Sequence, residues 1–90
     1  MESLQIKSRI VTDKEVCGGS PRIEGTRIRV MDVVEEYEFL GYNPERIAES
    51  FGISLAQVFA ALAYYYEHSE EIKAEIREHK DFVERLRHGD

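Results

Sequence analysis

A helix-turn-helix pattern over residues 44–66 constrains the fold of this chain more than any other feature. Ala48, Gly52 and Val58 stand at the spacing of that motif, as a small contact residue, a glycine at the turn and an apolar lock on the second helix. Further apolar residues supply the buried faces around them: Ile47, Phe51, Ile53, Leu55 and Leu62. Such a unit normally places its second helix in a DNA major groove. Residues 54–66 contain no Lys or Arg, so the pattern predicts a DNA-binding frame without its usual basic residues.

Local signals predict where the two helices of this motif begin. Asn43 is a favourable N-cap, and Pro44 suits the first position of a helix that ends at Phe51. Ser54 and Gln57 have the spacing of a capping box at the start of the next helix. We expect that helix to bury four side chains: Leu55, Val58, Leu62 and Tyr65.

An additional helix is predicted over residues 31–40, and Gly41 is expected to end it. Its apolar stripe comprises Val30, Val33, Val34, Tyr37 and Leu40. Together with the helix-turn-helix, this segment predicts a mainly α fold of three packed helices.

A short β-element is expected before these helices. Residues 5–12 are β-prone, and Glu24-Gly25 suits the turn of a hairpin because glycine adopts positive φ without strain. Alternation after the turn predicts a half-buried strand whose outer face is basic. We call Arg22, Arg27 and Arg29 the basic ribbon. The ribbon is the first candidate for DNA contact, and Ser54 and Gln57 are the second.

A last helix is predicted to start at Ser69. Its apolar positions recur at spacings of four, three, four and three: Ile72, Ile76, His79, Val83 and Leu86. This stripe is narrow and suits a seam between helices. Two interpretations remain open: the helix lies along a partner or a second copy, or it docks on its own domain with frayed final turns.

Composition limits the classes of function. Ninety residues form one small domain, for which oligomerisation is a common source of stability. The net charge of −6 argues against non-specific nucleic-acid binding by the whole chain, but residues 1–30 carry +2 and residues 31–90 carry −8. No apolar run approaches a membrane span, and the start lacks the apolar core of a signal peptide. With a single cysteine, Cys17, these features favour a cytoplasmic protein that contacts no membrane.

No residue pattern indicates catalysis. His68, His79 and His88 do not share metal-ligand spacing on one helix face, and Cys17 has no base near it in the sequence. Gly18-Gly19 lacks the Lys-Ser/Thr that follows in a phosphate-binding loop. We therefore expect no catalytic residue, no metal site and no cofactor.

Two segments, GGSPRIEGTRIRV and NPERIAESFGISLAQVFAALAYYYEHSEEI, together resemble domain-of-unknown-function family 433, small bacterial and archaeal proteins regarded as VapB-like antitoxins. The resemblance covers about residues 8 to 76. It implies a homeodomain-like helix-turn-helix behind a short β-element, and a homodimer. It also implies an operon partner, a PIN-like ribonuclease toxin, that the protein inhibits while it represses the shared promoter.

These observations divide the chain into an antitoxin-like helix-turn-helix domain with a β-ribbon over residues 1–76 and a C-terminal helical tail over residues 77–90. The first hypothesis is a non-catalytic antitoxin that binds the nuclease and, as a dimeric autorepressor, promoter DNA. The alternative is a protein-interaction or dimerisation module with a helix-turn-helix scaffold and little or no DNA binding. The predicted partner or dimer interface comprises Ile23, Ile28, Phe59, Tyr64, Ile72, Ile76, Val83 and Leu86.

Overall fold

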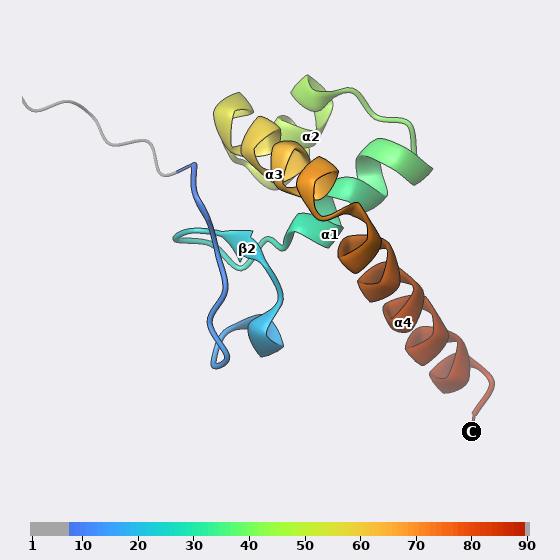
Figure 1. The fold of residues 1–90 in the computed structure, drawn as a ribbon. Helices are drawn as coiled ribbons and strands as arrows, with labels where there is room; N and C mark the ends of the chain where they lie inside the picture. Colours follow the sequence, from blue (N-terminus) through green and yellow to red (C-terminus); the bar gives the residue numbers. More distant parts are fainter. Residues whose placement is uncertain (1–7, 90) are drawn as a thin grey trace, which may run out of the picture.

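The chain is mainly helical, with a small antiparallel sheet at its N-terminal side (Figure 1). The computed structural model describes residues 8–89. The elements follow in the order β1 (Ile10–Val11), a 3₁₀ turn η1 (Cys17–Gly19), β2 (Arg22–Ile23), α1 (Val30–Val34), a π-helical segment η2 (Glu35–Phe39), α2 (Pro44–Phe51), α3 (Leu55–Glu67) and α4 (Ser69–Arg87). The mainly α architecture with a short β-element is therefore confirmed.

The predicted helix starts are confirmed in detail. The Asn43 side chain accepts a hydrogen bond from the Arg46 backbone N–H at 2.8 Å, and Pro44 opens α2. At the start of α3, the Ser54 backbone N–H donates to Gln57 Oε1 at 2.7 Å. The Gln57 N–H donates in return to Ser54 Oγ at 3.1 Å. These bonds satisfy backbone donors that have no partner within the helix.

A sharp turn separates α2 from α3. Gly52 ends α2 with φ of 69°, a left-handed conformation in which a side chain would be strained. The two helix axes differ in direction by 113°. Among the described residues, no single helix is long and apolar enough to span a membrane; the α2–α3 pair meets that length and hydropathy only across this bend.

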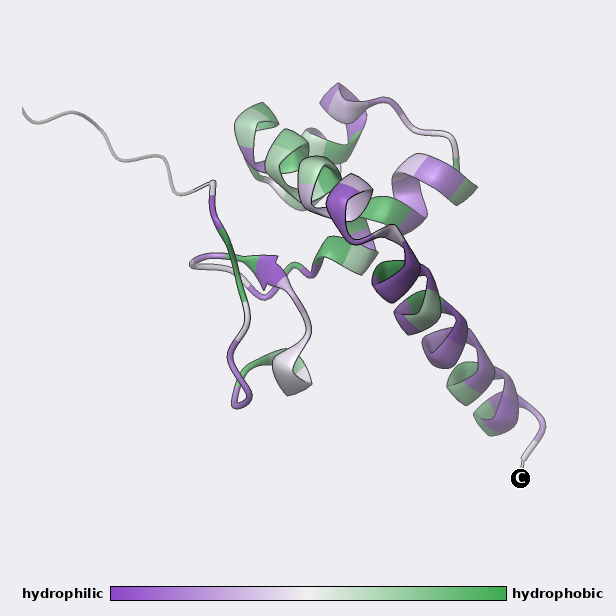
Figure 2. Cartoon of the chain, viewed as in Figure 1, coloured by the Kyte–Doolittle hydropathy of each residue, from purple (hydrophilic) through white to green (hydrophobic). Residues whose placement is uncertain are grey.

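The core lies where α1, α2, α3, β2 and the first half of α4 meet. Its buried members are Ile23, Val30, Met31, Val33, Val34, Ile47, Val58, Ala61, Leu62, Tyr65, Ile72 and Ile76. α4 contributes only its first two turns to this core, because every side chain over residues 80–89 is exposed. The rest of α4 projects away from the domain (Figure 1), and apolar positions remain on its far turns (Figure 2).

The N-terminal β-element differs from the predicted hairpin. β2 pairs with β1, in the register Ile10 with Ile23 and Val11 with Arg22. Residues 22–29 do form a turn, closed by a single bridge between Arg22 and Arg29. The segment beyond the turn is shorter than the expected strand: the Ile28 carbonyl accepts the Ile23 N–H, Arg29 makes the bridge, and Val30 already begins α1. Residues 5–7 of the predicted β-prone segment lie outside the described residues.

Two predicted core positions, Leu40 and Leu55, are also wrong. Val30, Val33 and Val34 are buried as expected, but the helix changes to the π-helical segment η2, and Leu40 is exposed at its end. Leu55 at the first turn of α3 is likewise exposed. Val83 and Leu86 do not continue the buried stripe of α4 onto its own domain.

Candidate functional site

The basic ribbon does not present three free guanidinium groups. Arg29 donates to both carboxylate oxygens of Asp32, from Nε at 3.1 Å and from Nη2 at 2.9 Å. Its backbone N–H also donates to Asp32, which ties the residue to the first turn of α1. The bond to Asp32 raises the pKa of Arg29, so this side chain is held as part of the fold.

The two other ribbon residues are in contrasting situations. Arg22 is half-buried: Nη1 donates to the Thr26 carbonyl at 3.0 Å, and Nε is buried with no hydrogen-bond partner among the described residues. Arg27 is exposed, and its guanidinium contacts no acceptor within residues 8–89. Of the three ribbon residues, only Arg27 has a guanidinium group that makes no hydrogen bond or ion pair with another described residue.

The predicted contacts at the start of α3 are also engaged in the fold. Ser54 Oγ and Gln57 Oε1 each accept the backbone N–H of the other residue. An outside hydrogen-bond donor would have to compete with this capping box. The two side chains therefore have a structural role at the start of α3.

α3 carries an exposed apolar stripe. Leu55, Phe59 and Tyr66 share one side of the helix, and Phe59 and Tyr66 are 51% and 61% exposed. Ala56 and Ala63 are exposed beside them. Large exposed apolar side chains that adjoin one another are typical of surfaces that contact another protein. We call Leu55, Ala56, Phe59, Ala63 and Tyr66 the α3 stripe.

The remaining predicted interface residues fall into three groups: buried, half-buried and exposed. Ile23, Ile72 and Ile76 lie in the core of the single chain, so they offer no exposed surface to a partner. Ile28 and Tyr64 are half-buried and pack against the core, and Tyr64 also stacks on His68 with ring centroids 4.0 Å apart. Three apolar residues at the end of α4 are exposed, and we call them the α4 tip: Phe82, Val83 and Leu86.

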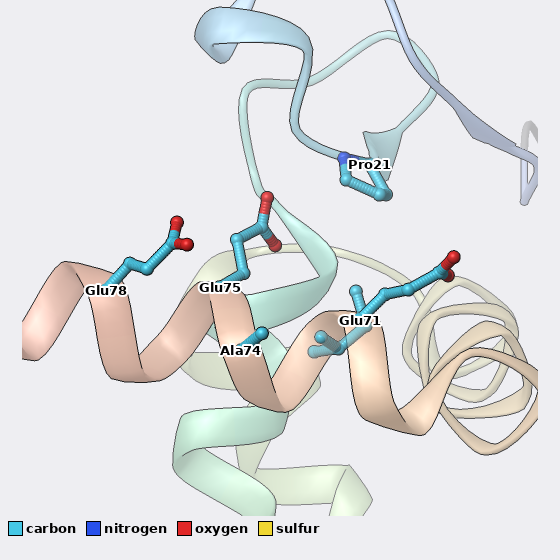
Figure 3. Close-up of a pocket in the computed structure, with 6 residues that line it drawn as sticks. Pro21, Glu71, Ala74, Glu75 and Glu78 are labelled. Atoms are coloured by element: carbon cyan, nitrogen blue, oxygen red, sulfur yellow. The ribbon is translucent and has the colours of Figure 1, made fainter.

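One flank of α4 is acidic. Glu71, Glu75 and Glu78 line a cavity of about 310 Å³ opposite Pro21 (Figure 3). None of the three forms an ion pair with another described residue, and Glu75 Oε1 is buried without a hydrogen-bond partner in that part of the chain. Burial, followed by the charges of Glu71 and Glu75, raises the pKa of Tyr64. This flank therefore lowers the potential around Tyr64 and repels other anions.

The opposite flank of α4 is basic, and sequence reasoning missed it. Lys73, Arg77 and Lys80 border a groove of about 350 Å³ between η2, α3 and α4. The Lys80 ammonium lies over the Phe39 ring, 4.2 Å from its centroid. The three bases recur at spacings of four and three residues, which places them on one helix side and was a signal readable from the sequence. We call this cavity the basic groove.

Within residues 8–89, no three or more His, Cys, Asp or Glu side chains lie close enough together to hold a metal ion.

A family model and a solved structure are similar to this chain. A family model described as "Protein of unknown function (DUF433)" matches residues 10–65, which span the sheet, α1, α2 and most of α3. The crystal structure of a DUF433 member protein from Anabaena variabilis ATCC 29413 is similar, with 32% sequence identity and a TM-score of 0.70. The similarity covers 79% of this chain and 70% of that chain. No curated protein matches.

Proposed function

This chain belongs to the DUF433 family, and we propose that it is a non-catalytic, protein-binding antitoxin that neutralises a PIN-like ribonuclease in the cytoplasm. The observation that carries the proposal is the amount of exposed apolar surface on a small domain. Two separate sets, the α3 stripe and the α4 tip, lie outside the core. Scattered single apolar residues need no explanation, but adjoining ones favour contact with other proteins.

The α3 stripe supports a homodimer. Its two alanines are exposed beside the larger apolar side chains, so a second α3 can approach closely on that flank while Phe59 packs against it. The absence of Lys and Arg over residues 54–66 removes charge repulsion between two copies of this surface. A twofold contact of α3 on α3 would cover the same patch on both copies.

The dimer contact is tested with Phe59→Glu, which places a charge in the centre of the stripe. Because Phe59 is half exposed, folding stability should change by no more than about 0.5 kcal/mol. Light scattering after size exclusion should show a dimer for the native chain and a monomer for this variant. Glu67→Gln, exposed at the end of the same helix, is the control and should stay dimeric. A monomeric native chain would remove the dimer from the proposal.

The α4 tip supports the contact with the nuclease. Leu86 is 61% exposed and belongs to a continuous helix, so it offers a preformed apolar anchor for a groove on a partner. Leu86→Ser should weaken inhibition of the nuclease encoded by the neighbouring reading frame by about tenfold or more. Asp81→Ser, exposed on the opposite side of α4, should leave inhibition unchanged. Equal inhibition by all three proteins would reject the tip as the contact.

Binding of promoter DNA is the second candidate function. It is supported by the 113° angle between α2 and α3 and the left-handed Gly52 between them, which suit a homeodomain-like helix-turn-helix. Arg27→Ala should weaken binding to the DNA upstream of the gene and make its logarithmic salt slope shallower by about one unit per copy. Arg85→Ala, an exposed arginine on α4, is the control. Unchanged binding at matched salt would exclude Arg27 as a DNA contact.

A further inference from the structure

We propose that the basic groove binds a partner segment in which apolar and acidic residues alternate. The inference rests on the proposed function for the identity of the partner, but its chemistry can be tested with a peptide alone. It concerns a different side of α4 from the acidic flank drawn in Figure 3.

The floor of the groove is apolar and preformed. Val34 from α1, Tyr65 from α3 and Ile76 from α4 form it, and all three belong to the core. Phe39 from η2 stands at the edge with 57% of its surface exposed. A volume of about 350 Å³ has the size of a site for a few side chains. An apolar side chain placed here would bury the open part of Phe39 without any change in the core.

The rim of the groove is cationic. Lys73, Arg77 and Lys80 form no ion pair with any residue between 8 and 89. Glu38 is the one carboxylate among the lining residues, so the groove carries an excess of two positive charges in a chain whose net charge is −6. A ligand with carboxylates beside its apolar group would therefore complement both the floor and the rim.

The same side of α4 continues beyond the groove, which favours a peptide segment as the occupant. Ile76, Lys80, Val83 and Arg87 follow one another at spacings of four, three and four residues and lie on one helix side. This side thus alternates apolar and basic positions over several turns. An acidic amphipathic segment can follow it along the helix, whereas a small molecule would contact only the groove.

The test uses a fluorescein-labelled peptide made of two repeats of Leu-Glu-Glu-Leu-Ala-Glu-Glu, with fluorescence anisotropy as the readout. The native protein should bind this peptide, with an affinity that falls as salt is raised. A matched peptide with lysine in place of every glutamate should not bind. Binding of both peptides, or of neither, would overturn the proposal.

Two arginine variants distinguish binding at the groove from attraction by the overall charge of the protein. Arg77→Glu should weaken binding by about tenfold or more because it reverses a charge on the rim. Arg85→Glu makes the same change of net charge outside the groove and should have little effect. Phe39→Ser should weaken binding at unchanged net charge. Equal losses from Arg77→Glu and Arg85→Glu would show non-specific attraction and reject the site.

A second copy of the chain is the competing occupant, because its acidic flank could face the same bases. Size-exclusion light scattering of the native protein and of Arg77→Glu distinguishes it. Self-association that Arg77→Glu abolishes would assign the groove to a second copy and overturn the peptide proposal. No nuclease is present in these assays. A negative result would therefore overturn the groove proposal only, and the antitoxin proposal is tested separately with Leu86→Ser.

Discussion

Replacing Ile76 with Ala measures where α4 stops being part of the folded core. Ile76 is 2% exposed and packs in the core with residues of α1 and α3. The change removes three buried carbon groups, each worth about 0.8 kcal/mol of transfer free energy, and leaves a cavity. We therefore expect the free energy of unfolding to fall by about 2.5–4 kcal/mol. In a domain of this size that loss lowers the melting temperature by roughly 10 °C or more.

Val83→Ala is the matched control, one heptad further along the same helix stripe. Val83 is 38% exposed and outside the core, so its truncation should change stability by no more than about 0.5 kcal/mol. Urea unfolding followed by circular dichroism, at two protein concentrations, measures both variants. A loss below about 1 kcal/mol for Ile76→Ala, or equal losses for both variants, would refute the boundary. A midpoint that depends on concentration would show that oligomerisation contributes to the difference.

Two further changes test local interactions. Asp32→Ala removes the acceptor for the backbone and guanidinium of Arg29, so urea unfolding should show a loss of about 1–2 kcal/mol, and no loss would contradict the cap of α1. Burial, then the charges of Glu71 and Glu75, raises the pKa of Tyr64, so the folded chain holds this proton more tightly than the unfolded chain. Stability should therefore fall as pH rises above about 10, and Tyr64→Phe should make the fall shallower in thermal melts. Identical slopes would count against this coupling.

Features set by neighbouring residues were predictable from the sequence. Asn43 with Pro44, and Ser54 with Gln57, act within one helical turn, so residue type and spacing were enough to place both helix starts. Gly52 was predictable for the same reason, since the left-handed turn favours glycine whatever surrounds it. These positions define the angle between α2 and α3 and hence the frame of the domain.

Burial was less predictable, because the periodicity of one helix does not show how much of it another element covers. Leu55 and Leu86 occupy apolar positions of their helices, yet both are exposed. Ile72 and Ile76 occupy the same stripe as Leu86 but are buried, since only the first turns of α4 reach α1 and α3. The apolar residues of α4 are therefore buried in the core at the start of the helix and exposed at its end.

The lining of the basic groove comes from two parts of the chain, α1 with η2 and α3 with α4. Lys73, Arg77 and Lys80 were visible as one side of a helix, but Phe39 was expected only as part of a preceding helix. Phe39 is the last residue of the π-helical segment η2, and its ring contacts Lys80 of α4. No local pattern predicts this contact.

The ion pair of Arg29 limits how strongly the chain can bind DNA. A phosphate contact from Arg29 requires two charge-assisted bonds to Asp32 to break, and this costs about as much as the new contact provides. Arg22 is held by Thr26, so within the basic ribbon only Arg27 can reach a phosphate without breaking a hydrogen bond of the fold. With one such arginine per copy, the ribbon provides a weak electrostatic component compared with proteins that make about 6–10 phosphate contacts. Contact through the exposed apolar residues of α3 and α4 breaks no hydrogen bond of the fold. This difference in free-energy cost favours our proposal of protein binding over DNA binding.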